Sequence, residues 1–402
     1  MKDGPILGSW FIAGFEGSTH VRADGRRLDL VAATQHDRLA GRDYARMAAL
    51  GIRAARESLR WHLSEPRRGR WDWSADRPRI AAAARAGVTV AWDLCHFGWP
   101  DHVDPFAADF PERFAAWAGA AAELVASEQD PPYWFAPQNE ISFLAWAGGD
   151  MGVMNPMARG RGQELKRQLV RGAILAMDAI RSVLPVARFL HPEPLINVAV
   201  DPARPHERSH AAEATHAQFE AWDMLAGRTA PELGGSERYL DVLGANYYPD
   251  NQWTAGGGTL PFGDPSRVRL SALLAVLHAR YDRPIVISET GTEDELRAPW
   301  LRSVCGEVDE ARAAGVPVAG VCLYPILNHP GWEDDRHCHN GLWDYAGPRG
   351  GRDGHRPLLD AIRSWSPPAA PVGASMTGSR ARPGQAPRRP ARRLAEASER
   401  PA

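Results

Sequence analysis

Short runs of apolar residues recur along the chain, and glycine, proline or aspartate bounds each of them. Successive residues within a run are hydrophobic, which is typical of parallel strands that are covered on both faces. We expect strands over residues 8–15, 52–58, 88–94, 133–137, 188–191, 242–247, 285–288 and 318–323.

Between these runs lie segments rich in alanine, leucine and arginine, in which hydrophobic residues recur at helical spacing. We expect helices over residues 37–50, 76–86, 111–127, 163–183, 211–225, 269–279, 299–314 and 358–365. Gly51, Gly87 and Gly315 each follow a helix and precede a strand, where glycine can end a helix in the left-handed conformation. Eight strands that alternate with eight helices predict an α/β fold, a closed (β/α)₈ TIM barrel.

The composition changes abruptly after Trp365. Residues 367–402 are mainly proline, alanine, arginine, serine and glycine, and they lack the apolar side chains that a core needs. We therefore predict a single barrel domain over residues 1–366 and a disordered tail over residues 367–402. The tail carries seven arginines and two glutamates. It could touch an anionic surface, but a solvated tail is the simpler interpretation.

The overall composition argues against some classes of binding partner. A chain of 402 residues with 44% hydrophobic content can bury a large core, and a net charge of −2 argues against nucleic acid as a partner. No stretch is apolar enough for a membrane helix or a secretion signal, so we expect a cytoplasmic protein without a membrane partner. Four cysteines without paired spacing then indicate free thiols. The oligomeric state does not follow from the sequence.

Two glutamates stand at the ends of predicted strands. Glu140 follows the strand over residues 133–137, and Glu289 follows the strand over residues 285–288. The carboxyl ends of barrel strands are where (β/α)₈ enzymes carry their catalytic residues. Hydrolysis of a glycosidic bond needs one carboxylic acid and one carboxylate beside the sugar. The pair therefore predicts a glycoside hydrolase with a carbohydrate or glycoside substrate.

Strands on opposite sides of a barrel can bring two carboxyl groups to the separation of about 5–5.5 Å that a retaining mechanism needs. We assign Glu289 as the nucleophile and Glu140 as the general acid and then the general base. Arg56 ends the second strand, where its charge can keep Glu289 ionised. Asn139 can donate to a sugar 2-hydroxyl, a contact that strengthens in the transition state.

The sixth strand ends in Asn246, Tyr247 and Tyr248. Side chains alternate along a strand, so Asn246 and Tyr248 share one face. If this face lines the pocket, Tyr248 can hydrogen-bond to Glu289 and Asn246 can reach the sugar. The alternative is that both tyrosines pack in the barrel core with satisfied hydroxyl groups.

Tryptophan is abundant, with fifteen residues in the chain, and several follow predicted strands. An indole can stack on the apolar face of a sugar, but a single tryptophan more often serves packing. Only their clustering at one end of the barrel would favour sugar binding. The candidates are Trp61, Trp99, Trp253, Trp332 and Trp343.

With these residues identified, the chain resembles family 1 glycoside hydrolases and their clan A relatives, from about Phe11 to Trp343. Any one matching stretch is weak evidence, whereas five in the right order are strong. They are residues 43–61, Leu94-Cys95-His96-Phe97-Gly98-Trp99-Pro100, Asn139-Glu140, Gly244-Ala245-Asn246-Tyr247-Tyr248 and Ser288-Glu289-Thr290-Gly291.

The resemblance implies a TIM barrel with β-glucosidase-like or β-galactosidase-like activity and no cofactor. Carried over by position, it makes Glu140 the acid/base and Glu289 the nucleophile, with Arg56 and Tyr248 as partners of the nucleophile. It also implies that three further residues bind the sugar, namely His96, Asn139 and Asn246.

Several departures from the family pattern indicate a divergent member. Gln138 and Ile141 stand where the acid/base motif usually has threonine and proline. After the eighth strand, in the stretch from Tyr324 to Trp332, Gly331 replaces the glutamate that binds the outer hydroxyls of glucose or galactose. The glutamine that shares this task near the N-terminus is replaced too, and Glu16 and His20 are the candidates for a different recognition pattern. The catalytic residues transfer, whereas the identity of the sugar does not.

Two other functions remain open from the sequence. Histidines and a cysteine at His329, His337, Cys338 and His339 could bind a metal, although adjacent side chains rarely converge on one ion. A barrel that binds carbohydrate without turnover is the other, and the presence of both glutamates argues against it.

Overall fold

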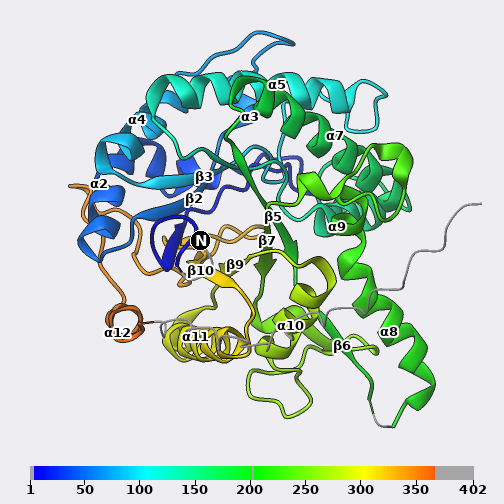
Figure 1. The fold of residues 1–402 in the computed structure, drawn as a ribbon. Helices are drawn as coiled ribbons and strands as arrows, with labels where there is room; N and C mark the ends of the chain where they lie inside the picture. The colour runs from blue at the N-terminus through cyan, green and yellow to red at the C-terminus, as the bar shows by residue number, and fades with distance from the viewer. Residues whose placement is uncertain (1–3, 202, 367–402) are drawn as a thin grey trace, which may run out of the picture. The chain divides into compact units, whose positions relative to one another are not determined.

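The computed structural model describes residues 4–201 and 203–366, and the predicted tail over residues 367–402 lies outside the described residues. Eight parallel strands close into a barrel in the order β1-β10-β9-β7-β5-β4-β3-β2. Helices encircle the strands in Figure 1, as expected of a TIM barrel. The barrel strands are β1 (Phe11–Gly14), β2 (Ala54–Ser58), β3 (Thr89–Asp93), β4 (Trp134–Ala136), β5 (Arg188–Pro194), β7 (Val242–Asn246), β9 (Ile285–Thr290) and β10 (Val318–Leu323). All eight correspond to predicted strands, which confirms the predicted fold.

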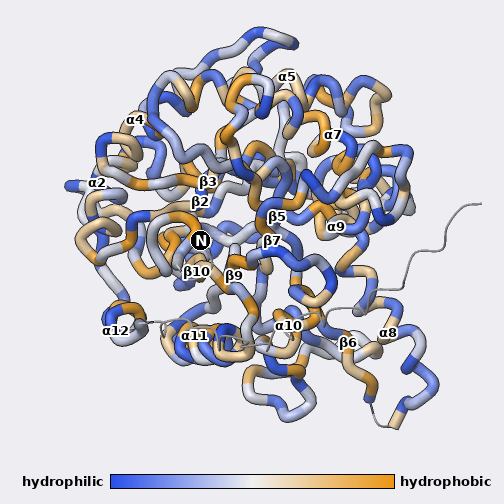
Figure 2. Tube along the Cα trace, viewed as in Figure 1, coloured by the Kyte–Doolittle hydropathy of each residue, from blue (hydrophilic) through white to orange (hydrophobic). Residues whose placement is uncertain are grey.

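The eight predicted helices agree with the structure to within a few residues, with one exception, and three short helices at residues 30–33, 61–64 and 141–144 were not predicted. The described residues form twelve α-helices. They are α1 (Leu30–Ala33), α2 (His36–Ala49), α3 (Trp61–Ser64), α4 (Arg77–Ala86), α5 (Phe110–Glu128), α6 (Ile141–Leu144), α7 (Gly162–Val183), α8 (Arg208–His216), α9 (Glu220–Leu225), α10 (Leu270–Tyr281), α11 (Arg297–Ala313) and α12 (Arg356–Ser364). Hydrophobic and hydrophilic stretches alternate along the surrounding helices in Figure 2. Burial of the apolar stripe against the strands therefore holds the helices in place.

The exception is the single helix that we predicted over residues 211–225. A 3₁₀ turn at Ala217–Phe219 separates α8 from α9. The amide of Gln218 explains the break, because its oxygen accepts from the N–H of Ile196 and its nitrogen donates to the carbonyl of Thr215. The helix α8 packs beside the small parallel sheet of β6 (Asn197–Ala199) and β8 (Gln252–Thr254), whereas α9 belongs to the ring around the barrel.

The three glycines expected at helix ends all have positive φ, at 80° for Gly51, 63° for Gly87 and 89° for Gly315. The four cysteines are buried and free. Among the described residues, no helix is both long and apolar enough to cross a lipid bilayer.

Two apolar layers place the functional side chains. An inner cluster fills the barrel and includes Ala54, Ala91 and Val242, while a larger cluster lies between strands and helices. Side chains two residues apart on a strand point the same way. The residues that follow the inner cluster along β2, β3 and β7 therefore point inward at the carboxyl ends of the strands, and several of them are polar.

Candidate active site

Glu289 lies on β9 and is held by two donors. Its Oε1 accepts from Arg56 Nη1 at 2.6 Å, and its Oε2 accepts from the hydroxyl of Tyr248 at 2.8 Å. Arg56 points inward from the middle of β2, and Tyr248 follows β7 on the inward face that its alternation with Asn246 predicts. Glu289 is 5% exposed, so these two donors stabilise a buried carboxylate.

Arg56 is itself fixed by two further buried side chains. Its Nε and Nη2 lie 3.0 and 2.8 Å from the carboxylate of Asp93, and Nη2 also donates to Asn139 Oδ1 at 2.5 Å. Asp93 Oδ2 lies 2.9 Å from His96 Nδ1. The guanidinium is 1% exposed and cannot swing away without breaking several charged hydrogen bonds. It is therefore a rigid partner for Glu289.

A break in strand register brings two successive residues of β9 to the inner face. Ala245 pairs with Ile287 but Asn246 pairs with Glu289, so one extra residue, Ser288, is accommodated between them. Such a bulge redirects a side chain next to a site. The hydroxyl of Ser288 donates to Asn246 Oδ1 at 2.5 Å while Glu289 also points inward.

Asn246 connects the two glutamates. Its Nδ2 donates to Glu140 Oε1 at 2.8 Å, while its oxygen is occupied by Ser288, the residue before Glu289. The structure thus brings Glu140 and Glu289, which are far apart in the sequence, to the same end of the barrel.

The backbone at Glu140 adopts the left-handed conformation, with φ 42° and ψ 63°. This conformation is strained for a residue other than glycine, and such strain persists only where neighbouring groups restrain the backbone. Strand β5 supplies the restraint. The N–H of Glu140 donates to the carbonyl of Pro192 at 3.0 Å, and the N–H of Ser142 donates to the carboxylate of Glu193 at 3.1 Å.

The environments of the two glutamates differ in charge. Burial raises the pKa of Glu140 well above its usual range, and the nearby charge of Glu289 raises it further. Burial also raises the pKa of Glu289, but the charges of Arg56 and His96 oppose that rise. Both pKa values are raised, that of Glu140 more strongly, so of the two carboxyls Glu289 is the one favoured to ionise.

Glu193 is a third buried carboxyl beside the pair. Burial raises its pKa to about 7, although the hydrogen bonds from Ser142 lower it. Its charge in turn raises the pKa of Glu140. Glu193 was not predicted as a site residue because the predicted fifth strand stopped at residue 191, and Asp93 was not predicted either. A charged residue inside an apolar strand was the available signal for Asp93.

Glu16, His20 and His96 lie beside Glu289. Glu16 Oε1 accepts from the N–H and the hydroxyl of Ser18 at 2.9 and 2.6 Å and lies 3.6 Å from His96 Nε2. Burial favours the neutral form of Glu16, but the charges of His96 and His329 lower its pKa overall. Burial lowers the pKa of His20 to about 4, so its imidazole is neutral at neutral pH.

The ring of Tyr324 lies between His96 and Arg56. Its ring lies parallel to that of His96 with centroids 5.9 Å apart, and the guanidinium of Arg56 lies 5.4 Å from the Tyr324 ring centroid. A Cβ on Gly14 would lie 2.1 Å from the Tyr324 ring, so only glycine fits at this position of β1. Tyr324 therefore joins the site.

The candidate tryptophans differ in their surroundings, because one lies beside the site and others lie in the apolar core. Trp332 is half-buried with its ring centroid 5.0 Å from that of His20. Trp61 is instead packed against α5, where its ring stacks on Trp117 and its indole N–H donates to Glu65. Trp99 is 5% exposed within the larger apolar cluster. We therefore correct the expectation that Trp61 contacts substrate, because core packing occupies its ring, whereas contact of Trp99 with substrate stays a prediction.

The metal alternative gains no support. Within residues 4–201 and 203–366, no group of three or more His, Cys, Asp or Glu side chains is arranged to hold a metal ion. His337 stacks on His339 and contacts Asp344 through Nε2 at 3.0 Å. His329 Nε2 instead lies 3.0 Å from the amide nitrogen of Asn340.

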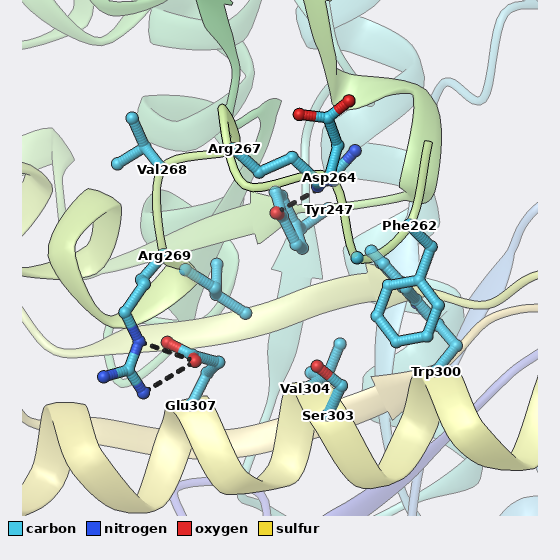
Figure 3. A pocket seen from close by; sticks show the side chains of 12 residues that line it. Tyr247, Phe262, Asp264, Arg267, Val268, Arg269, Trp300, Ser303, Val304 and Glu307 are labelled. Carbon is cyan, nitrogen blue, oxygen red and sulfur yellow. Dashed lines mark hydrogen bonds and ion pairs between the residues drawn. The ribbon is translucent and has the colours of Figure 1, made fainter. Parts of the chain in front are cut away.

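A separate cavity of about 200 Å³ lies between the start of α10 and α11. Figure 3 shows Phe262 and Trp300 on one side of it and the pair of Arg269 and Glu307 on the other. Tyr247 contributes to its lining, whereas neither Glu140 nor Glu289 does. The alternation of Tyr247 and Tyr248 thus separates this cavity from the candidate active site.

Comparison with solved structures identifies the fold. The β-glucosidase from Thermotoga maritima in complex with glucoimidazole is similar at a TM-score of 0.71 and 18% identity, over 90% of this chain and 98% of that one. The same coverage holds for the family 1 β-glucosidase from Thermotoga maritima, at a TM-score of 0.69 and 17% identity, and for the Thermotoga maritima enzyme in complex with deoxynojirimycin, at 0.71 and 16%. No protein-family model matches the sequence, and no curated protein sequence matches it. The chain thus has the fold of a family 1 β-glucosidase with a widely diverged sequence.

Proposed function

We propose that the protein is a retaining β-glycosidase that hydrolyses O-glycosidic bonds through a double displacement. One observation carries the proposal. Glu289 receives hydrogen bonds from Arg56 and Tyr248, whereas among the described residues Glu140 accepts a side-chain hydrogen bond only from the amide of Asn246 and has a strongly raised pKa. An ionised nucleophile and a protonated acid are what the first step needs. The fold, shared with β-glucosidases, supports the same function.

In the first step, Glu289 attacks the anomeric carbon while Glu140 gives its proton to the departing oxygen. The ester that forms removes the negative charge of Glu289. Because that charge raises the pKa of Glu140, its loss lowers the pKa and allows Glu140 to act as a base. In the second step, Glu140 takes a proton from water, and the water cleaves the ester with a second inversion. No cofactor takes part.

The residues around the pair are proposed as sugar ligands. Glu16 offers a buried carboxylate, His20 and His96 offer imidazoles, and Trp332 offers an apolar ring. Asn139, Asn246 and Tyr324 complete the set, although Arg56 and His96 already share the amide of Asn139. Buried polar groups that await a hydroxyl discriminate strongly among sugars, so we expect one sugar to be clearly preferred.

A screen of aryl β-glycosides tests the proposal. It should cover glucosides, galactosides, mannosides, fucosides and phosphorylated sugars, and we expect measurable kcat/KM for at least one. NMR of the product at early times should show the β-anomer. An initial α-anomer would refute the nucleophile role of Glu289. Saturable sugar binding with no cleavage of any glycoside would instead favour a carbohydrate-binding barrel without catalysis.

A further inference from the structure

The cavity between the start of α10 and α11 has an aromatic wall, formed by the rings of Tyr247, Phe262 and Trp300. The ring centroids of Trp300 and Phe262 are 5.3 Å apart in an edge arrangement, and those of Trp300 and Tyr247 are 5.5 Å apart with 21° between the planes. Phe262 and Val268 are 39% and 36% exposed, so solvent reaches the cavity beside them. Its volume of about 200 Å³ is smaller than the roughly 300–1,000 Å³ of sites for drug-sized ligands. We therefore expect a ligand with a single ring.

Arg267 lines this cavity and is a cation without a carboxylate partner. Its Nη1 donates to the carbonyls of Pro249 and Leu260 at 2.6 and 2.7 Å, and its Nη2 donates to the hydroxyl of Tyr247 at 3.1 Å. A guanidinium has about five N–H donors, so N–H groups on Nε and Nη2 remain without an acceptor in the described part of the chain. No described carboxylate forms an ion pair with Arg267 either. Neutral groups therefore hold this half-buried side chain in place and leave its charge unpaired.

Tyr247 adds a third unused donor. Its hydroxyl oxygen accepts from Gln252 Nε2 at 2.8 Å and from Arg267 Nη2 at 3.1 Å. The backbone of Val268 fixes the orientation of the Gln252 amide, because its N–H donates to Oε1 at 2.9 Å and its carbonyl accepts from Nε2 at 2.8 Å. The proton of the Tyr247 hydroxyl thus has no acceptor among the described residues, although Tyr247 is only 4% exposed. A buried donor of this kind calls for a partner from outside the chain.

The other charged groups around the cavity are paired or turned away. Arg269 forms ion pairs with Glu307, at 2.8 Å, and with Glu310. Asp264 accepts from the N–H of Ser266 at 2.8 Å, and Figure 3 shows its carboxylate pointing away from the aromatic wall. Arg267 therefore supplies the charge that remains for a ligand.

The donors of Arg267 and Tyr247 and the aromatic wall together determine the ligand class. A carboxylate can accept two N–H groups from one guanidinium, and a planar ring packs on other aromatic rings in offset or edge-on geometry. A sugar needs polar partners around its whole ring, whereas one side of this cavity is apolar. We propose that the cavity is a second ligand site, that it binds a small aromatic carboxylate such as benzoate, and that this ligand is an effector of the proposed active site.

Hydrogen bonds to β9 connect the cavity to Glu289. The N–H of Tyr247 donates to the carbonyl of Glu289 at 2.9 Å. The indole N–H of Trp300 donates to the hydroxyl of Thr290 at 2.9 Å, and this hydroxyl donates to the carbonyl of Tyr247 at 2.7 Å. A ligand packed on the aromatic wall therefore restrains the segment of β9 that carries Glu289. The effector role rests on the proposed function, because only a nucleophile at Glu289 makes this restraint measurable in kcat.

Calorimetry with the full chain measures binding, with benzoate, benzyl alcohol and cyclohexanecarboxylate as probes. Benzyl alcohol keeps the ring and lacks the charge, whereas cyclohexanecarboxylate keeps the charge and lacks the planar ring. We expect benzoate to bind roughly tenfold tighter than either, because it alone combines a charged hydrogen bond with aromatic packing. Equal affinity for all three probes would overturn the proposed ligand class.

Two variants locate the binding. Ser303→Phe places a ring in the cavity and leaves the bonds of Arg267 intact, and Ser182→Phe is its control at an exposed position of α7. Arg267→Met removes the charge, and Arg302→Met is its control at an exposed position of α11 outside the cavity. We expect roughly tenfold weaker benzoate binding in Ser303→Phe and in Arg267→Met and unchanged binding in both controls. Unchanged binding in Ser303→Phe would overturn the proposal even if Arg267→Met does not fold.

Steady-state kinetics with the preferred glycoside tests the effector role. We expect saturating benzoate to raise kcat on the order of fivefold, the lower end of typical coupling between two sites, and to leave KM unchanged. Ser303→Phe should lose this rise. A higher KM at constant kcat that persists in Ser303→Phe would place benzoate in the active site and overturn the proposal, and an unchanged kcat would refute the effector role.

The two proposals fail in different ways. Cleavage of glycosides by a protein that binds no benzoate would refute the second ligand site and leave the glycosidase intact. Benzoate binding that Ser303→Phe removes, in a protein that cleaves no glycoside, would refute the glycosidase and the effector role and leave the cavity as a ligand site.

Discussion

The backbone N–H of Ser142 donates to the carboxylate of Glu193 across the gap between two neighbouring strands, at 3.1 Å. Through this bond a buried residue of β5 holds the turn that presents Glu140. The same carboxylate also acts on Glu140 electrostatically, because its ionised form raises the pKa of Glu140. Glu193 thus affects both the position and the proton of the proposed acid.

Two substitutions separate these effects. Glu193→Gln keeps an acceptor for Ser142 but removes the charge, so the pKa of Glu140 should fall and the basic limb of the kcat/KM profile should move to lower pH. Glu193→Ala also releases the turn, and displacement of the acid should lower kcat by roughly 10–100-fold. Glu164→Gln, at an exposed pair with Arg161, serves as the control. An unchanged pH profile in Glu193→Gln would show that its charge does not reach Glu140.

Tyr247 and Tyr248 provide a second test. The hydroxyl of Tyr248 stabilises the ionised form of Glu289, so Tyr248→Phe should raise the pKa of Glu289. The acid limb of kcat/KM, which reports ionisation of the nucleophile, should then move to higher pH. Tyr247→Phe is the matched control, because the Tyr247 hydroxyl bonds to Gln252 and Arg267 on the other side of the strand. A shift of the same size in both variants would contradict the assignment.

The barrel could be predicted from the sequence because the patterns that indicate it are local and recur along the chain. Apolar runs, helical spacing and glycines such as Gly87 occur in every αβ unit, and each unit supports the others. Period-two alternation also predicted which of Tyr247 and Tyr248 faces Glu289. Trp61 was misplaced because a tryptophan after a strand can turn either toward the substrate or toward a neighbouring helix, and only three-dimensional packing decides.

The features that were not predicted depend on tertiary contacts, and such contacts leave no pattern within a single segment of the sequence. The bulge at Ser288 depends on the register between β7 and β9, and the role of Glu193 depends on its contact with a loop from another strand. The break at Gln218 arises from a hydrogen bond to Ile196, over twenty residues away. Spacing within one segment carries none of this information.

Substitutions of Glu140 and Glu289, the proposed acid and nucleophile, should respond differently to the leaving group. Glu140→Ala should lower kcat/KM by roughly 10²–10⁴-fold for alkyl glycosides and much less for activated aryl glycosides, because only the former need protonation. Glu289→Ala should abolish turnover of both, and azide or formate should restore it by entering the vacated space. Steady-state kinetics with the two substrate classes measures this. An equal loss for both classes in Glu140→Ala would mean that Glu140 is not the acid.

A buried charge network on the outer side of β2 should govern stability. Arg79 pairs with Glu57 and Asp76, and all three are fully buried. Arg79→Met removes the guanidinium from two buried carboxylates and should lower the free energy of unfolding by about 3–5 kcal/mol. Arg171→Met, at an exposed pair with Glu112, should cost less than about 1 kcal/mol. Urea titration of both variants measures the difference, and equal losses would show that the network is not the cause.

The same network makes the fold sensitive to acid. Burial favours protonation of Glu57, but Arg79 and His36 lower its pKa from 4.5 to about 2 in the folded state. Because this folded pKa is depressed, its contribution to stability is present above pH 4.5 and should be lost as the pH falls from 4.5 toward 2.

Substitution of Glu16 tests whether the loop after β1 contributes to recognition of the sugar. Charges of His96 and His329 lower its pKa, so at neutral pH it offers a carboxylate that can accept two sugar hydroxyls. Glu16→Gln replaces one charged acceptor by an amide donor, and a hydrogen bond to a charged group is worth about 1.5–3 kcal/mol. We therefore expect KM for the preferred sugar to rise by roughly 10–100-fold, with a smaller change for sugars that lack the hydroxyl concerned. Glu333→Gln, an exposed change in the loop after β10, should leave KM unaltered. If Glu16→Gln lowers kcat equally for every sugar and leaves KM unchanged, Glu16 acts through His96 on the catalytic groups and not on the substrate.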